Sequence, residues 1–500
     1  MEELGGRRPL GPLGPVNEGR PAHGQVTKAE SDTIGVFGPG LRALTIGLFL
    51  AVTMIGFEAL GVSAAMPRVA AELQGSRLYG LAFGAFMLGQ LVTIPMAGAA
   101  ADRRGSRTPY LIGLVTFALG LAIASAAPNM PTLVGARMIA GLGAGAVTAL
   151  NLAAIGRAYP ERLRSKMFAV ISTAWVVPGA IGPTIAGWVT DHSTWRWVFG
   201  GLLPLVPFVA LLVAPALSRA ASGAASPTSK SEATKVTKTA LRLAFATAGV
   251  VGGLSVRNPA LTLGSVVGGV VFGGPALRRL LPVGTLRLTP GLPAVVGAVS
   301  LIMTTFVSAE AFVPRVLHDF RGRSTTIAAV ALTGGTLTWT VGSWLQARSP
   351  LWWADRRRLV LATFGLGAGV ASILAVLWIR VPLWIAYVGW TAGALGMGLA
   401  FTSTSEASLR LADPDTVGRV AAATQLAPSL GIAIITAACG RIAADGTIGA
   451  LRAVYFVMLA LIVVTAFAMW RTGLRGRRDE RQRRMARATK SVPKAVKIAK

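Results

Sequence analysis

The sequence predicts an all-α polytopic membrane protein. Its 500 residues are 53% hydrophobic and 14% charged, whereas a soluble globular chain carries about 25% charged residues. The mean hydropathy is +0.60. Several windows of about 20 residues, the length that a helix needs to cross a bilayer, hold at most one charge. This composition argues against a water-facing enzyme.

The apolar segments set the predicted number of spans. The segments 240–256 and 259–277 are weaker than the rest and form an inserted helical pair. Only 14 residues separate Arg242 from Arg257, which is short for a span unless both arginines snorkel. We therefore expect 14 spans, or 12 if this pair is a re-entrant or interfacial hairpin. The other segments are 42–65, 79–100, 108–127, 131–155, 167–190, 197–217, 291–313, 325–346, 358–378, 382–409, 419–441 and 450–470.

Polar stretches divide these spans into domains. The Ser-, Thr- and Lys-containing stretch after the sixth span is typical of a flexible linker. The predicted order is a disordered cytoplasmic tail (1–40), a six-helix bundle (41–217), a cytoplasmic linker (218–239), the inserted helical pair and its loop (240–290), a second six-helix bundle (291–470) and a basic cytoplasmic tail (471–500).

The net charge of +29 is distributed unevenly along the chain. Basic residues gather in every second loop and in the C-terminal tail, which indicates cytoplasmic termini under the positive-inside rule. We expect these loops and the tail to bind anionic lipid headgroups rather than nucleic acid. The expected location is a bacterial plasma membrane, with no obligate protein partner. The single Cys439 excludes an intrachain disulfide.

An internal repeat predicts that the two bundles are pseudo-symmetric, a common plan for transporters. Several residues recur 253 positions later, and Glu58 meets Glu310 with a slip of one residue. The recurring positions are Asp102-Arg103-Arg104 with Asp355-Arg356-Arg357, Gly143 with Gly396, and Gly145 with Gly398.

The stretch GAAADRRGSR lies between the second and third predicted spans. It resembles the loop signature of the major facilitator superfamily, and more narrowly of its 14-helix drug:proton antiporter branch. The resemblance implies a conformational latch that stabilises the outward-facing state by ion pairs across the halves. A solvated basic loop is the alternative. The matching residues are Gly98, Asp102, Arg103, Gly105 and Arg107, with Asp355 and Arg356 as the weaker copy in the second half, and Ser106 departs from the signature.

Two further stretches carry the same resemblance. RMIAGLGAG places Arg137 inside the fourth span, where an arginine costs about 2.5–3.5 kcal/mol on insertion scales. The resemblance implies that Arg137 acts in proton coupling, and snorkelling to the outer surface is the alternative. PGAIGPTIAG in the fifth span resembles the antiporter helix motif, which implies export, although Pro178 and Ala186 depart from it. Its matching residues are Gly182, Pro183 and Gly187.

Two carboxylates are predicted to lie well inside spans, namely Glu58 and Glu310. An isolated charge is costly in hydrocarbon, so each should face a central polar cavity. Glu58, with Glu310 as a weaker candidate, could carry protons, bind a cationic substrate, or do both. Alternatively, Glu58 is a structural partner of a polar neighbour. Glu310 could lie near the outer mouth, because Pro314 follows closely and opens a loop. Trp175, Trp339 and Trp390 could line the cavity or contact lipid.

These patterns predict a secondary active transporter and not an enzyme. The sequence holds no phosphate-cradling G-x-x-x-x-G-K-S/T motif, which argues against ATP, so we expect a proton gradient as the energy source and no cofactor. We expect no metal, because none of the three histidines lies at metal-ligand spacing to another His or Cys. The resemblance implies export of amphipathic or cationic small molecules by alternating access. Two alternatives remain: a dedicated exporter of a lipid, siderophore or metabolite, and a non-transporting sensor or scaffold that docks through its basic tail.

Overall fold

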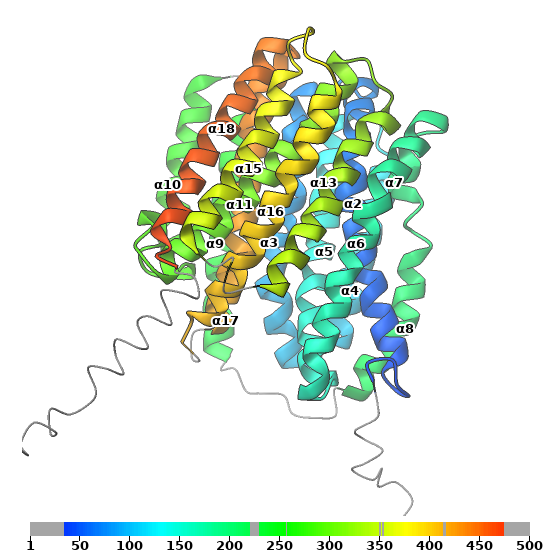
Figure 1. The fold of residues 1–500 in the computed structure, drawn as a ribbon. Helices are drawn as coiled ribbons and strands as arrows, with labels where there is room; N and C mark the ends of the chain where they lie inside the picture. The colour runs from blue at the N-terminus through cyan, green and yellow to red at the C-terminus, as the bar shows by residue number, and fades with distance from the viewer. Residues whose placement is uncertain are drawn as a thin grey trace, which may run out of the picture.

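The computed structural model describes residues 35–220, 230–256, 258–349, 352, 355–413 and 417–474. Within these ranges the chain forms helices and turns, without a β-strand. The long helices run side by side along one axis (Figure 1). Most of the predicted N-terminal tail, residues 221–229 of the predicted linker and nearly all of the C-terminal tail lie outside the described residues. The expectation of a flexible linker is wrong for residues 230–239, which are helical.

The helices form a first half, an insert and a second half (Figure 1). The first half comprises α2 (Arg42–Glu72), η1 (Ser76–Leu78), α3 (Tyr79–Arg104), α4 (Arg107–Ser125), α5 (Met130–Ala158), α6 (Glu161–His192), α7 (Arg196–Gly200) and α8 (Leu205–Ala220). The insert is α9 (Lys230–Ser255) and α10 (Pro259–Leu280). After η2 (Thr285–Arg287), the second half comprises α11 (Leu292–Glu310), α12 (Val313–Arg315), η3 (Val316–Phe320), α13 (Thr325–Arg348), α15 (Arg356–Ala375), α16 (Trp384–Arg410), α17 (Val417–Ile442), η4 (Ala443–Asp445) and α18 (Ile448–Arg471).

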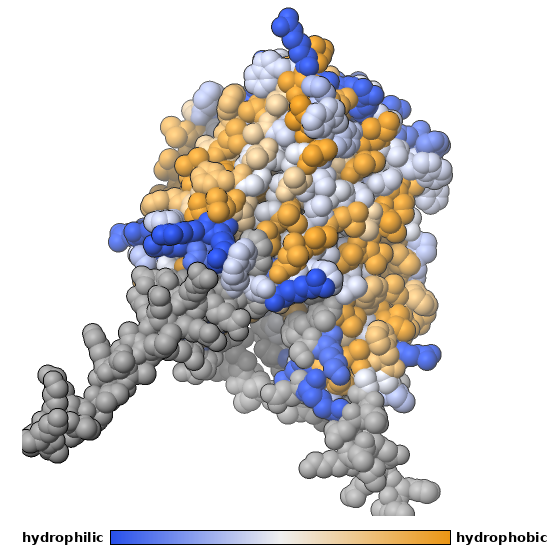
Figure 2. All heavy atoms as spheres, viewed as in Figure 1, coloured by the Kyte–Doolittle hydropathy of each residue, from blue (hydrophilic) through white to orange (hydrophobic). Residues whose placement is uncertain are grey.

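Eleven of the described helices are long and apolar enough to cross a membrane. The helices α6, α9 and α13 cover three predicted spans but are not among these eleven, and the apolar part of α9 is the shorter stretch Leu241–Ser255. The predicted membrane architecture is confirmed, whereas the count of 14 spans is not, and 12 remains allowed. Apolar side chains cover most of the face in Figure 2, and hydrophilic side chains gather towards its two ends.

The repeat appears in how the helices pack. A Cβ atom placed on Gly143 of α5 would lie 2.3 Å from the backbone nitrogen of Phe117 on α4. A Cβ atom on Gly396 of α16 would lie 2.2 Å from the carbonyl oxygen of Ala362 on α15. Small residues let helix backbones approach closely in membranes. The two halves therefore use the same glycine position to pack the same pair of helices.

The insert contacts both halves. Leu243 of α9 packs in one apolar cluster with Leu91 of α3 and Leu426 of α17. At the other end of α9, Arg441 of α17 donates to the carbonyl oxygen of Leu254 at 3.2 Å. Such a bond satisfies one of the carbonyl groups that a helix C-terminus leaves open. Helix α9 therefore covers the seam where α3 of the first half meets α17 of the second.

We call the end of the molecule that holds the last residues of α2, α6 and α17 and the first residues of α3 and α13 the outer end. It lies opposite the first residue of α2, and the positive-inside rule predicts that it faces outside.

Candidate functional site

The two predicted charges of the first half meet in a buried ion pair. Glu58 of α2 has no exposed surface and Arg137 of α5 is 2% exposed. Nη1 of Arg137 pairs with Oε1 of Glu58. The arginine therefore turns into the protein, and the alternative that it snorkels to the outer surface is wrong. Pairing lowers the cost of burying each charge.

Helix α3 supplies the remaining contacts of the guanidinium. Nε of Arg137 donates to the carbonyl oxygen of Ala82 at 3.3 Å. The guanidinium carbon lies 4.4 Å from the centroid of the Phe86 ring. Gly141, one turn after Arg137, makes this approach possible, since a Cβ atom there would lie 2.1 Å from the carbonyl oxygen of Phe86. Residues of the motif predicted in the fourth span thus hold the arginine against α3.

The second half also buries a carboxylate. Glu310 ends α11 and is 5% exposed. Its Oε1 has no hydrogen-bond partner in the described part of the chain. The expectation that Pro314 opens a loop is wrong, because α12 and η3 carry the chain on to Phe320, and Val313 and Leu317 are fully buried. Proline fits the first turn of a helix, where its missing N–H costs no hydrogen bond.

The predicted cavity tryptophans do not form one group. Trp390 of α16 is fully buried and stacks on Phe306 with ring centroids 5.3 Å apart. Trp339 meets the same phenyl ring edge-on at 5.3 Å. Trp175 on α6 is 45% exposed. Lipid contact is therefore wrong for Trp390, and the aromatic cluster belongs to the second half.

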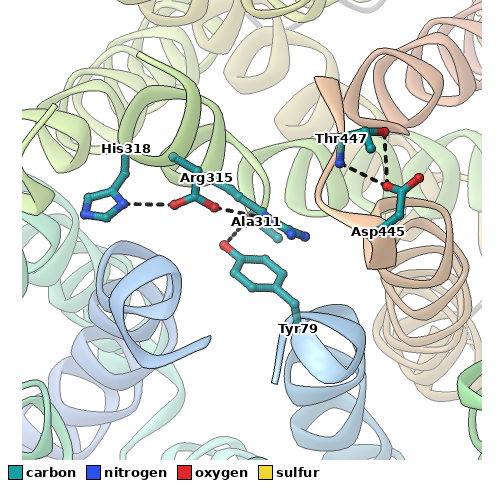
Figure 3. A network of polar contacts seen from close by, with 7 residues as sticks. Tyr79, Ala311, Arg315, His318, Asp445 and Thr447 are labelled. Carbon is teal, nitrogen blue, oxygen red and sulfur yellow. Dashed lines mark hydrogen bonds and ion pairs between the residues drawn. The ribbon is translucent and has the colours of Figure 1, made fainter. Parts of the chain in front are cut away.

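The two halves are joined at the outer end by contacts that sequence reasoning missed. The hydroxyl of Tyr79 on α3 donates to the carbonyl oxygen of Ala311 at 2.8 Å (Figure 3). Asp191 of α6 accepts hydrogen bonds from the backbone N–H groups of Thr325 and Thr326 at 3.1 and 2.8 Å, so it caps α13 of the other half. Burial raises the pKa of Asp191, but the hydrogen bonds from Thr326 and Thr325 outweigh it, and the net pKa is lowered.

The antiporter helix motif lies on the surface of α6 that faces α13. A Cβ atom on Gly187 would lie 2.8 Å from Cα of Thr326. Thr184 and Thr333 join their hydroxyls at 2.9 Å between the same two helices. Gly182 faces the ring of Phe57 instead, at 3.4 Å from its ideal Cβ. The small residues here bring α6 and α13 into backbone contact, and Pro183 is buried beside them.

The structure describes only some side chains of the predicted latch. Gly105 has φ +75°, in the region that favours glycine. Arg107 is exposed, and Ser106 accepts from Arg157 at 2.8 Å. Gly98 has open space around its ideal Cβ. The side chains of Asp102 and Arg103 lie outside the described residues.

The weaker copy of the latch makes contacts within the second half. Asp355 accepts from the backbone N–H of Arg357 at 2.8 Å and caps α15. The guanidinium of Arg356 lies 4.1 Å from the ring centroid of Trp470. The latch role of both copies therefore stays a prediction.

Two repeated bundles of membrane-spanning helices, with charged side chains buried between helices, define the class of secondary transporters. Within that class, residues 46–436 match the family model described as Major Facilitator Superfamily. The chain therefore belongs to this superfamily.

Sequence relatives match over part of their length. The chain is 33% identical over 158 residues to the "Probable multidrug-efflux transporter Rv1634" of Mycobacterium tuberculosis, covering 32% of this chain and 34% of that protein. It is 30% identical over 174 residues to the multidrug transporter protein MdtP of Bacillus subtilis, covering 35% and 32%. The chain thus matches about a third of the length of these curated relatives.

Solved structures agree in fold. A D-xylose–proton symporter superposes with TM-score 0.61 at 15% identity, covering 86% of this chain and 97% of that one. The human organic anion transporter MFSD10 superposes with TM-score 0.54 at 16% identity, covering 86% and 99%. At these identities the similarity shows the fold alone.

Proposed function

We propose that this chain is a proton-coupled exporter of amphipathic or cationic small molecules that works by alternating access. The observation that carries the proposal is the buried pair of Glu58 and Arg137. An ionisable residue inside a membrane helix is expensive and in general marks a proton or substrate path. The names of the sequence relatives support export and the substrate class.

The geometry supports a competition at Glu58. A proton on this carboxylate removes the charge that faces Arg137, and a cationic substrate bound nearby competes for the same charge. Arg137 keeps its other contacts when Glu58 is neutral, namely the carbonyl of Ala82 and the ring of Phe86. Both residues are on α3, and so is Tyr79, which bonds the second half at the outer end. Helix α3 thus contacts Arg137, the partner of Glu58, and also carries Tyr79, which bonds the second half at the outer end.

The contacts between the halves support alternating access. Those at Tyr79, Asp191 and Thr184 lie between mid-depth and the outer end. A transporter with a closed outer end has to break such contacts to release substrate there. The bonds are few and individually worth about 1 kcal/mol, which suits a closure that opens in each cycle.

Transport of ethidium in reconstituted vesicles under an imposed proton gradient tests the proposal. We expect gradient-driven flux in the wild type and its loss in Glu58→Gln. Glu72→Gln is the matched control, because Glu72 ends the same helix at a partly exposed pair with Arg196, and its flux should remain near the wild-type level. Flux that survives Glu58→Gln would contradict the role of this carboxylate.

Two further outcomes separate the alternatives. Folded protein that moves neither ethidium nor other lipophilic cations would overturn the multidrug substrate class and favour a dedicated natural substrate. Deleting residues 475–500 should leave flux intact, whereas a scaffold that docks through its basic tail would lose its function. A proton gradient that does not change the flux of the wild type would overturn proton coupling itself.

A further inference from the structure

A buried arginine, Arg315, lies beside the contact between Tyr79 and Ala311 that joins the two halves at the outer end. Arg315 is 3% exposed, and its Nε donates to Oδ2 of Asp319 at 3.3 Å. Nη1 is buried without a hydrogen-bond partner among the described residues. The guanidinium carbon lies 5.2 Å from the ring centroid of Tyr79, and Figure 3 shows the two side chains together next to Ala311. The carboxylate of Asp319, bonded to Nε alone, and one aromatic ring only partly compensate this charge.

An unmatched acceptor lies on the same segment. Oε1 of Glu310, five residues before Arg315, is buried without a hydrogen-bond partner in the part of the chain that the structure describes. The two groups are not within ion-pairing distance in this structure, although each has an atom that the other could satisfy. The burial of both groups makes their present separation costly whenever Glu310 is ionised.

The chain between and beyond these residues is irregular. Helix α11 ends at Glu310, α12 holds three residues, and η3 is a π-helix over Val316–Phe320. Short π-segments are rare and frequently mark functional sites. A segment with broken helical register can turn the Arg315 side chain towards either end without disturbing a continuous helix.

We propose that Arg315 exchanges partners between Glu310 and Asp319 and thereby links a proton on Glu310 to closure of the outer end. When Glu310 is ionised, the Arg315 side chain turns to it and leaves its position beside the Tyr79 ring. When Glu310 takes a proton from solvent, Arg315 returns to Asp319 and to the Tyr79 ring, and the outer end closes. Arg315 is thus a positioning residue, and this inference rests on the proposed proton coupling.

The exchange would explain how an exporter avoids closing its outer end when it carries neither substrate nor a proton. An outer end that closes only over a protonated Glu310 prevents the unloaded, unprotonated carrier from returning inwards. In the present structure Tyr79 bonds Ala311, and Oε1 of Glu310 has no hydrogen-bond partner among the described residues. This arrangement matches the closed and protonated step of the cycle.

Other titratable groups surround the segment and have to be considered. Nδ1 of His318 lies 2.9 Å from Oδ1 of Asp319, so a cationic His318 would compete with Arg315 for the aspartate. We therefore include His318→Gln as a background for the acidic part of the pH series. The nearby titratable groups without positive charge are Tyr79 on α3, Tyr455 on α18, Cys439 on α17 and Asp445 on η4. The other nearby cations bond elsewhere: Arg321 donates to the carbonyl oxygen of Val376, and Arg452 on α18 donates to that of Leu377.

Carbodiimide labelling tests the exchange without requiring transport. Dicyclohexylcarbodiimide reacts with protonated carboxyl groups, and peptide mass spectrometry of the full chain in lipid nanodiscs gives the labelling midpoint of Glu310 across a pH series. We expect Arg315→Gln to raise this midpoint by about 1 to 3 pH units, because a nearby cation favours the ionised form. We expect Asp319→Asn to lower it, because Arg315 then turns to Glu310. The shifts have opposite signs, which general loosening of the fold would not produce.

Three controls complete the experiment. Glu58 is an internal reference whose midpoint should stay constant, because its partner Arg137 is unchanged. Arg321→Gln removes a nearby arginine that donates to the carbonyl of Val376, and it should leave Glu310 unaffected. Arg315→Lys should bring the midpoint back towards the wild type, which keeps the test valid if Arg315→Gln does not fold.

Unchanged midpoints in both variants, or shifts of equal sign, would overturn the exchange. Because labelling needs no substrate, this result is independent of whether ethidium is transported. A protein without dye flux could still show the two opposite shifts, and a dye exporter could lack them.

Discussion

The two halves share a helical framework but differ in what they bury at the same repeat position. Arg137 on α5 and Trp390 on α16 lie 253 positions apart. In the first half the arginine pairs with Glu58. In the second half the indole stacks on Phe306, and Glu310 is left without a partner on Oε1. The repeat therefore preserves packing and leaves the electrostatics free to diverge.

The outer ends differ in a similar way. Asp191 lies in the last turn of α6 in the first half and accepts hydrogen bonds from the first N–H groups of α13 in the second. Asp445 of η4, which directly follows α17, accepts from the backbone N–H of Thr447 at 3.0 Å within its own half. Equivalent helix ends thus make one bond across the halves and one local bond. The first half holds the ion pair and also the carboxylate that reaches across to the other half.

The largest expected effect concerns the ion pair. Arg137→Met leaves Glu58 buried without its cation, and removing one partner of a buried pair costs about 3–5 kcal/mol. We expect a large fall in the thermal unfolding midpoint of the purified protein. Adding Glu58→Gln should recover part of the loss, because no uncompensated charge remains.

Glu310→Gln is the matched variant in the second half. It removes no ion pair, so its unfolding midpoint should stay near the wild-type value. If Arg137→Met were as stable as the wild type, the contrast between the halves would not hold.

The second prediction tests the shared framework. Gly143→Ala and Gly396→Ala each place a Cβ atom against a neighbouring backbone, and overpacking costs about 1–3 kcal/mol. We expect the two variants to lower the unfolding midpoint by similar amounts. Gly156→Ala on α5, which has open space around its ideal Cβ, should be neutral or slightly stabilising. Markedly unequal losses would show that the packing is not equivalent.

Much of this fold could be predicted from hydropathy and the repeat. The apolar windows located the spans, and the constant offset aligned α5 with α16. The same patterns singled out Glu58, Glu310 and Arg137 as charges inside spans. Hydropathy indicates which segments cross a membrane, because the free energy of transfer from water to the bilayer depends on composition.

The contacts between helices could not be predicted in the same way. Composition does not determine which face of α2 meets α5, so Glu58 and Arg137 were found separately but not paired. Tyr79 and Ala311 are 232 residues apart and meet only through the arrangement of the halves. Because the sequence predicts that Pro314 opens a loop, it does not mark Arg315 as a buried residue. Such contacts depend on tertiary geometry, for which one sequence holds no local signal.

The third prediction concerns the outer end. Asp191→Asn weakens the cap on α13, and losing such a cap costs about 0.5–2 kcal/mol. We expect fewer disulfides between Thr184→Cys and Thr333→Cys in a Cys439→Ser background, whereas Asp445→Asn should leave the yield unchanged. Because the pKa of Asp191 is lowered, its contribution is fully present above the usual carboxyl pKa and is lost as the pH falls through the lowered value. Equal yields in both aspartate variants would contradict a bond across the halves.

The smallest expected effect concerns Trp390. This residue occupies in the second half the repeat position that Arg137 occupies in the first. Nε1 of Trp390 is buried without a partner among the described residues, and such a donor carries a desolvation cost of about 1–3 kcal/mol. Trp390→Phe removes this donor and retains an aromatic ring against Phe306, so the relief offsets much of the lost packing. We expect the unfolding midpoint to change little, and Trp390→Ala to lower it strongly, because truncating a buried tryptophan costs about 3–5 kcal/mol.

The contrast with Arg137 gives this last prediction its meaning. If the indole N–H bonded to Glu310 in a conformation that this structure does not contain, Trp390→Phe would alter the labelling midpoint of Glu310. A constant midpoint together with near wild-type stability would mean that the ring acts through packing alone. The second half would then have no direct substitute for the arginine at this position. The cation available to Glu310 would then be Arg315, which follows the break between α11 and α12.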